Sequence, residues 1–276
     1  MRQKPKFSVL ISIYKKEKSQ YLIQCFNSLL QQSYLADEWV IVEDGPLTEE
    51  LYSVLDSFEK LYPNLIKRVK INEHVGLGAA LAEGIRYCSY ELIARMDADD
   101  ISCEDRFDRQ LKLFMRNPKL DICGSWIEEF ENDPMNIVSR RKVPIKERDI
   151  RKYQKRRDAF NHMTVMYKKR AVLEAGNYKS VPLMEDTALW VRMLQNGVHA
   201  TNIPRYLVKA RVGKDYYKRR GGWDYFKLYR NGKKEILKTG FISRWDYLST
   251  VIAQFFVALT PIALRRLIFK HFIHKY

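Results

Sequence analysis

Several common kinds of functional site need residues or spacings that this sequence does not have. Its four cysteines are widely spaced and form no C-x-x-C pair, so neither a zinc knuckle nor a dithiol redox centre is indicated, and buried thiols in a reducing cytosol are expected. The small-residue segment at 72–84 does not have the spacing G-x-G-x-x-G, which removes support for a dinucleotide-binding fold. The basic N-terminus leads into a strand-like run rather than a signal-peptide core, so export is not expected.

Acidic residues are scarce relative to basic ones. Lys and Arg total 49 against 33 Asp and Glu, a formal net charge of +16. An excess of this size indicates an anionic partner, which on composition alone is a nucleic acid, an anionic lipid or a phosphorylated substrate. The densest basic stretch, residues 140–157, is either a solvated helix or loop or a face turned toward such a partner. The 46% hydrophobic content of the 276 residues indicates one large globular domain, with or without an appendage.

One long uncharged run lies near the C-terminus. Residues 247–264 (YLSTVIAQFFVALTPIAL) contain no charged side chain, and Arg265 and Arg266 follow directly. A membrane span needs about 20 apolar residues, so this run is at the short limit, and it includes Gln254 and Pro261. Its aromatic and cationic flanks favour a helix lying on anionic lipid. A membrane span and a buried or oligomer-forming helix are the alternatives.

Apolar runs alternate with amphipathic segments over residues 1–118. The runs are β-branched and nearly continuous, as in strands that are covered on both faces, and each is followed by residues with helical spacing. This alternation predicts an α/β fold with a doubly wound, mostly parallel sheet, in which right-handed crossovers place all strand carboxyl ends on one side. The small residues of 72–84 fit either a phosphate cradle or a close helix–sheet contact. Predicted strands lie at 7–14, 39–42, 69–71, 92–96, 120–130, 161–167 and 206–212.

Acidic residues follow two of these strands. Asp97, Asp99 and Asp100 end the fourth run, and Glu43 and Asp44 end the second. A buried strand cannot hold acids in its core, so they are expected at the carboxyl edge, where open α/β sheets keep their ligand crevices. Crowded carboxylates repel one another unless a cation joins them, and Mg²⁺ or Mn²⁺ prefers oxygen ligands. A solvated acidic turn is the alternative, but the convergence of two acidic strand ends favours a site.

Two more candidates lie in the second half of the chain. Glu185 and Asp186 precede a helix, where the helix dipole favours acids, so this pair alone does not define a site. His162 is either a ligand or a hydrogen-bonding residue at the edge of the core, and we favour the second. The Gly221-Gly222 pair in a basic, aromatic loop suggests a hinge for a lid.

These segments resemble the motifs of family 2 glycosyltransferases of the GT-A type, and they look most like the bacterial capsule and exopolysaccharide group that includes the amylovoran enzymes. The resemblance covers about residues 7–212. It implies a GT-A nucleotide-sugar-binding and catalytic domain over residues 1–215. The composition of the remaining residues, 216–276, predicts a basic, amphipathic helical extension. The matching segments are SVLISIYK at 8–15, VIVEDGP at 40–46, NEHVGLGAALAEGI at 72–85, MDADD at 96–100 and EDTALWVR at 185–192.

The resemblance implies a nucleotide-sugar site at the strand ends. Ser12 and Tyr14 match positions that meet the nucleotide base, and Asp44 matches the acid that holds the base or ribose. Asp97 matches the acid directed at the ribose, and Asp99 matches the ligand of Mn²⁺ or Mg²⁺. The sequence departs from the family pattern at Lys15, Glu43 and Pro46, which makes the nucleotide contacts less certain but leaves the metal and base positions intact.

The resemblance also implies the reaction. Asp186 matches the catalytic base, and a single base acting opposite the leaving group inverts the anomeric centre. Arg211, Lys214 and Arg219 are candidates for closing on the diphosphate. The expected donor is a nucleotide sugar, with UDP favoured, and the expected acceptor is a lipid-linked saccharide at the cytoplasmic face of the bacterial plasma membrane, where the enzyme would be peripheral.

Three other classes of protein share some features with a non-processive glycosyltransferase. The sequence has neither the Q-x-x-R-W motif nor the several membrane spans of processive synthases, which favours transfer of one sugar per acceptor. A nucleotidyltransferase would share the sheet and the metal-binding acids. A nucleic-acid-binding protein would use the charge of residues 140–157, but no recognised binding module is present and nucleic acid is not expected as a partner.

Overall fold

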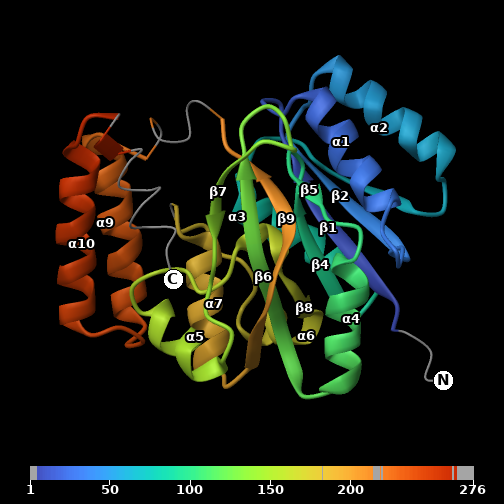
Figure 1. The fold of residues 1–276 in the computed structure, drawn as a ribbon. Coiled ribbons are helices and arrows are strands. Elements are labelled where there is room, and N and C mark those ends of the chain that lie inside the picture. Colours follow the sequence, from blue (N-terminus) through green and yellow to red (C-terminus); the bar gives the residue numbers. More distant parts are fainter. Residues whose placement is uncertain (1–4, 182, 214–217, 219, 263, 266–276) are drawn as a thin grey trace.

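The computed structural model describes residues 5–181, 183–213, 218, 220–262 and 264–265. In these residues a nine-stranded sheet has the order β3-β2-β1-β4-β8-β6-β9-β5, with β7 paired to β6 (Figure 1). The strands are β1 Phe7–Ile13, β2 Glu38–Asp44, β3 Ile66–Ile71, β4 Leu92–Asp97, β5 Ile101–Ser102, β6 Leu120–Phe130, β7 Ile137–Arg141, β8 Met166–Lys168 and β9 His199–Arg211. The helices are α1 Ser19–Leu30, α2 Glu49–Leu61, α3 Leu77–Tyr87, α4 Arg106–Arg116, α5 Glu147–Gln154, α6 Lys169–Glu174, α7 Glu185–Gln195, α9 Trp223–Lys238 and α10 Arg244–Leu259, with a 3₁₀ turn, η1, at His162–Thr164.

The first half of the sheet is parallel, as the sequence predicted. Strands β3, β2, β1 and β4 are joined by parallel pairings only, so their carboxyl ends lie at one edge. The second half is mixed, because β8 runs antiparallel to both β4 and β6, whereas β6 and β9 are parallel. The α/β fold with a mostly parallel central sheet is therefore confirmed.

Helices cover both faces of the sheet. Alternate side chains of a strand point to opposite faces, and two apolar clusters result. On one face α1, α2 and α4 pack against residues such as Val9 and Ile41. On the other, α3, α6 and α7 pack against Leu10, Val42 and Ile93.

Gly84 allows α3 to lie close to the sheet. A Cβ atom at this position would lie 2.5 Å from Cδ1 of Leu10 in β1 and 2.6 Å from Cγ2 of Val42 in β2. The small residues of this segment thus serve a close helix–sheet contact, one of the two alternatives that the sequence left open.

We expect Gly84→Ala to lower the free energy of unfolding by about 1–2 kcal/mol, because overpacking costs about 1–3 kcal/mol and the gain in helix propensity returns at most about 1 kcal/mol. Urea unfolding followed by circular dichroism measures the change. Gly213→Ala is the control, since no described atom lies within 4 Å of its added Cβ. Equal unfolding free energies for the two variants would contradict the close contact.

Ser102 pairs with Val208 in the sheet, and α4 begins only at Arg106. Two local predictions in the mixed region were wrong. The segment 161–167 was expected to be a strand, but η1 occupies its first half and β8 starts at Met166. Strand β9 begins at His199 instead of 206, with irregular register against β6 around Pro204, a residue that cannot donate to a ladder.

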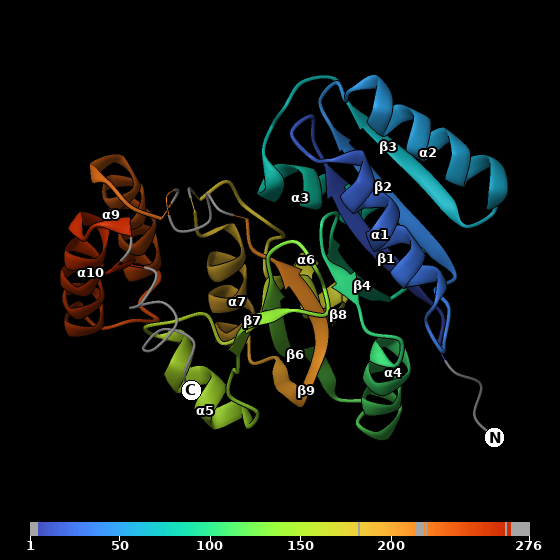
Figure 2. The same ribbon diagram turned by 45° about the horizontal axis from the view of Figure 1, so that its top comes forward.

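Helices α9 and α10 form a hairpin at the end of the molecule opposite α2 (Figures 1 and 2). The hairpin packs on α7 through an apolar cluster in which Met184, Ala188 and Val191 meet Ile236 and Ile242. Within the ranges that the structure describes, no helix is long and apolar enough to cross a membrane. The division of the chain at residue 215 stays a prediction.

Candidate active site

The carboxyl ends of β1, β2 and β4 bring four predicted nucleotide-binding residues to one sheet edge. Ser12 is in register with Asp97 of β4 on one side and with Val42 of β2 on the other. Tyr14 follows β1 directly, and Asp44 is the last residue of β2. The parallel topology therefore gathers residues that are up to 85 positions apart in the sequence.

Asp44 organises the loop after β3. Its side chain is 2% exposed and lies 2.9 Å from Nδ1 of His74. It accepts hydrogen bonds from the backbone N–H groups of Val75 (2.7 Å) and Gly76 (3.1 Å). The His74 ring in turn stacks on Tyr14, with 5.6 Å between ring centroids and 20° between planes. The carboxylate thus fixes an aromatic pair at the strand edge. The backbone N–H groups of Val75 and Gly76 are already hydrogen-bonded to it and are not available to bind a phosphate.

Asp97, the last residue of β4, and the following acids Asp99 and Asp100 have different environments. Asp97 accepts a hydrogen bond from Nη2 of Arg95. Burial and the nearby charge of Asp97 raise the pKa of Asp99 to about 6. Asp100 is buried, accepts the backbone N–H of Arg211 at 2.7 Å, and has a raised pKa because of burial and the charge of Asp99. The crowding predicted from the sequence is therefore present.

Arg211, a predicted diphosphate contact, lies beside these acids. Its Nε donates to the backbone oxygen of Asp99 at 3.0 Å. Its guanidinium lies 3.8 Å from the ring centroid of Tyr21 and 4.5 Å from that of Phe130. Much of this guanidinium is thus engaged in fastening the acidic turn to α1 and β6. Lys214 and Arg219, the other predicted diphosphate contacts, lie outside the described residues.

Asp186 lies in the first turn of α7 with its side chain 22% exposed. Its Oδ1 accepts the backbone N–H of Thr187 at 2.7 Å, and its Oδ2 lies 3.9 Å from Nδ1 of His162. Burial, then the charges of Asp158 and Glu185, raise the pKa of Asp186 to about 8. A carboxylate with a pKa near the working pH is suited to accepting a proton.

His162 is a hydrogen-bonding residue at the edge of the core, as favoured from the sequence. Its Nε2 lies 2.8 Å from the hydroxyl of Tyr178, and its side chain is 10% exposed. Burial and the charge of Arg95 hold the pKa of His162 well below its usual value, so the imidazole is neutral.

Two residues near these acids were not found from the sequence. Arg95 extends from the centre of β4 and is 2% exposed, and the available signal was a single charge that interrupts an otherwise apolar run. Asp158 accepts a hydrogen bond from the hydroxyl of Thr187, next to Asp186. It directly follows the densely basic stretch 140–157, and this position gave no signal.

The acidic turn suits a hard divalent cation. Its potential ligands are all carboxylate oxygens, and Asp99 is near a second negative charge that a cation would neutralise. Among the residues with described positions, no group of three or more His, Cys, Asp or Glu side chains could enclose an ion. Mg²⁺ and Mn²⁺ sites of this kind use one or two carboxylates and complete the coordination with substrate phosphates and water.

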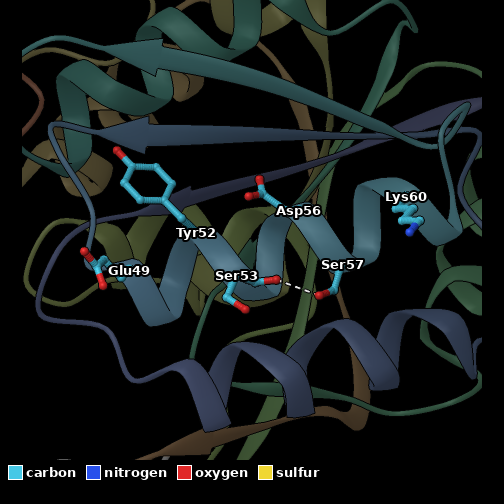
Figure 3. Close-up of a pocket in the computed structure, with 6 residues that line it drawn as sticks. All are labelled: Glu49, Tyr52, Ser53, Asp56, Ser57 and Lys60. Atoms are coloured by element: carbon cyan, nitrogen blue, oxygen red, sulfur yellow. Dashed lines mark hydrogen bonds between the residues drawn. The ribbon is translucent and has the colours of Figure 1, made fainter.

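A surface groove lies apart from this site. It has a volume of about 450 Å³ and runs along α2 (Figure 3). None of the predicted site residues lines it. Its lining residues are Glu49, Tyr52, Ser53, Asp56, Ser57 and Lys60.

The chain is similar to several known proteins. Residues 8–174 match the family described as glycosyl transferase family 2. The chain is 38% identical over 272 residues to the Escherichia coli UDP-Gal:alpha-D-GlcNAc-diphosphoundecaprenol beta-1,3-galactosyltransferase, with 99% of this chain and 98% of that protein covered. It is 39% identical over 240 residues to the amylovoran biosynthesis glycosyltransferase AmsE of Erwinia amylovora, with 86% and 88% covered.

A solved structure shows the same fold. The mannosyltransferase PcManGT from Pyrobaculum calidifontis, in complex with GDP-Man and Mn²⁺, matches with a TM-score of 0.65 over 92% of this chain and 70% of that chain, at 16% identity. The family match covers more than half of the chain, and the relatives align along most of it. The chain therefore belongs to glycosyl transferase family 2 and is a glycosyltransferase with the GT-A fold.

Proposed function

We propose that this enzyme transfers one sugar from a UDP-linked donor to a lipid-linked saccharide, with inversion at the anomeric carbon and with Mn²⁺ or Mg²⁺ as cofactor, in the synthesis of a bacterial surface polysaccharide. The observation that carries the proposal is the placement of two acid groups around one buried cation. Asp97, at the end of β4, and Asp186, at the start of α7, both lie within the electrostatic reach of Arg95. The E. coli relative, whose name specifies UDP-galactose and a diphosphoundecaprenol-linked acceptor, supports the choice of substrates.

The donor would lie along the strand edge. The stacked pair of Tyr14 and His74 offers an aromatic surface for the base, and Ser12 and Asp97 lie next to it at the ends of β1 and β4. Asp99 would hold the metal ion, which supplies positive charge to the diphosphate leaving group. In this arrangement Asp44 acts through the loop at 74–76, which it fixes.

The acceptor would approach from the side of α7. Asp186 accepts the proton of the attacking hydroxyl, and the neutral imidazole of His162, 3.9 Å away, leaves that carboxylate as the basic group. A single base on the side opposite the diphosphate gives inversion. With no processive motif in the sequence, the product leaves after one transfer.

The hairpin would hold the enzyme at the cytoplasmic face of the plasma membrane. One side of α10 exposes large apolar residues at spacings of three and four, which we call the apolar stripe: Trp245, Leu248, Ile252, Phe256 and Leu259. Exposed cations lie next to it. Arg244 begins the helix, and Arg156 pairs with Asp246 of α10 at 2.8 Å. Apolar side chains beside cations suit the interface of an anionic membrane.

The direct test is an assay with UDP-galactose, Mn²⁺ and a short-chain analogue of N-acetylglucosaminyl-diphospholipid. We expect release of UDP and a product with the opposite anomeric configuration to the donor, as read by NMR. Release of pyrophosphate in a parallel reaction with UTP and a sugar 1-phosphate, without transfer from UDP-galactose, would indicate a nucleotidyltransferase instead. A salt-sensitive RNA complex that is unaffected by Asp99→Ala, without any glycoside product, would favour the nucleic-acid-binding alternative.

We expect Asp99→Asn to raise the Mn²⁺ concentration for half-maximal activity by about tenfold or more, because the ion loses a charged ligand. The assay is a metal titration at saturating donor. Glu104→Gln, which neutralises an exposed acid five residues further along the chain, is the control and should leave the curve unchanged. Identical metal curves for wild type and Asp99→Asn would remove Asp99 from the metal site.

A further inference from the structure

Arg95 is a buried cation whose position follows from strand alternation. Leu92, Ala94 and Met96 of β4 point into the cluster beneath α1 and α4, whereas Ile93 points into the cluster beneath α3 and α7. Residues two apart share a face, so Arg95 is directed toward the side of α7. Asp97 lies on that same face and accepts a hydrogen bond from the guanidinium.

The burial of the Arg95 guanidinium lowers the stability of the fold. Nε and Nη1 of Arg95 are buried without a hydrogen-bond partner in the described part of the chain. An unsatisfied buried donor costs about 1–3 kcal/mol, and more when it is charged. A well-packed apolar side chain is often neutral or stabilising in place of a buried ion, so a structural role alone does not account for this residue.

The groups around Arg95 belong to both halves of the site. From β4 and the following turn come Asp97, Asp99 and Asp100, and from the start of α7 come Glu185 and Asp186. The charge of Arg95 also lowers the pKa values of His162 of η1 and of the phenol of Tyr178, although burial has the largest effect on each. The guanidinium is thus a positive charge shared by the donor acids and the proposed base.

We propose that Arg95 is a positioning residue for the transfer reaction, which holds Asp97 in place on the donor side and supplies a positive charge that favours the carboxylate form of Asp186 on the acceptor side. The proposal rests on the proposed function, because it assigns both acids their roles in transfer. The electrostatics agree: the charge of Arg95 lowers the pKa of Asp186, whereas Asp158 and Glu185 raise it.

A second buried arginine provides a comparison. Arg106 of α4 is fully buried, but its N–H groups bind the backbone oxygen of Arg95, the Gln110 side chain and the Met96 sulfur. None of these partners is a carboxylate. Arg106 therefore stabilises the backbone of β4, and its loss tests the effect of removing a buried arginine without removing the charge next to Asp97.

The test compares pH profiles. We expect Arg95→Met to raise the midpoint of the acid limb of kcat/KM, because a positive charge that lowers the pKa of Asp186 is lost, and to raise the donor KM, because Asp97 loses its hydrogen bond from the guanidinium. Arg95→Lys, which keeps the charge but not the planar fork, should bring the midpoint back toward wild type while the donor KM stays raised. Asp158→Asn should move the midpoint down, because it removes a negative charge near Asp186. Arg106→Met should reduce thermal stability and leave the midpoint in place.

A readout without turnover separates this proposal from the proposed function. The carboxyl ¹³C shift of Asp186, assigned by its loss in Asp186→Asn, is followed against pH in wild type and in Arg95→Met. An unchanged titration midpoint in folded Arg95→Met would overturn the role of Arg95, whether or not the enzyme transfers sugar. A raised midpoint together with no glycoside product in wild type would overturn the proposed function and leave the electrostatic role of Arg95 intact.

Discussion

Asp186→Asn is expected to lower kcat for sugar transfer by about 10²–10⁴-fold, the range that a positioned general base contributes. The amide keeps the size of the side chain, and the amide oxygen can still accept the N–H of Thr187, but it does not take a proton from the acceptor hydroxyl. Because the proposed donor site lies along β1, β2 and β4, the affinity for the donor should be unchanged. Single-turnover transfer and calorimetric titration with the UDP-sugar and Mn²⁺ measure the two quantities separately.

The neighbouring acid is the matched control. Glu185 shares the first turn of α7, but its Cβ is close to Gly78, where an added Cβ would lie 2.9 Å away, so it packs between α3 and α7. Glu185→Gln should therefore retain transfer within about tenfold, since it removes only a neighbouring charge. Wild-type transfer by Asp186→Asn, or equal losses in the two variants, would contradict the assignment of the base.

The raised pKa of Asp186 fixes the direction of the pH dependence. The carboxyl is mostly protonated when the pH is below its pKa of about 8, so kcat/KM should rise with pH and level off above that value. Stability should run in the opposite direction. The native state keeps a proton that the unfolded state has already released, so this group makes stability fall as pH rises from its unfolded pKa toward about 8. In Asp186→Asn the contributions of this group to the pH dependence of kcat/KM and of the free energy of unfolding should both be lost. A group that costs stability but serves activity is expected at an active site.

The parallel half of the fold could be predicted because burial on both faces leaves nearly continuous apolar runs. The convergence of Asp44 and Asp97 then follows from topology alone, since parallel strands end at one edge. The mixed half could not be predicted in this way. Strand β8 has only three residues, and the pairing of Ser102 with β9 joins segments about 100 positions apart. Neither leaves a local pattern in the sequence.

The acidic residues of the site could be predicted from the sequence, but the side chains that surround them could not. A carboxylate at a strand end is visible in the sequence, whereas the partner of each carboxylate depends on packing. Arg211 was predicted only as a diphosphate contact, and its stacking between Tyr21 and Phe130 depends on side chains from α1 and β6. Arg95 was passed over as part of an apolar run, because one charge among apolar neighbours does not reveal which acids it will face.

The apolar stripe could not be predicted from the sequence. The run at 247–264 is uncharged throughout, and only the fold shows which side chains stay exposed. Trp245, Ile252 and Phe256 are 69%, 54% and 64% exposed, respectively. Replacing all three with glutamine is expected to weaken binding to anionic vesicles by about 100-fold, since each side chain gains about 1 kcal/mol or more on entering the interface. Sedimentation with vesicles of phosphatidylglycerol and phosphatidylcholine measures this.

The control uses apolar residues at other positions on the surface. Leu35, Leu61 and Met135 are 55%, 69% and 80% exposed and lie outside the hairpin. The same three glutamine substitutions there should leave vesicle binding unchanged. Transfer to a water-soluble short-chain acceptor should be normal in both triple variants, because the apolar cluster that seats the hairpin on α7 is made by other residues. If the stripe variant binds vesicles like wild type but changes from dimer to monomer in analytical ultracentrifugation, the stripe covers a second copy of the chain and not a membrane.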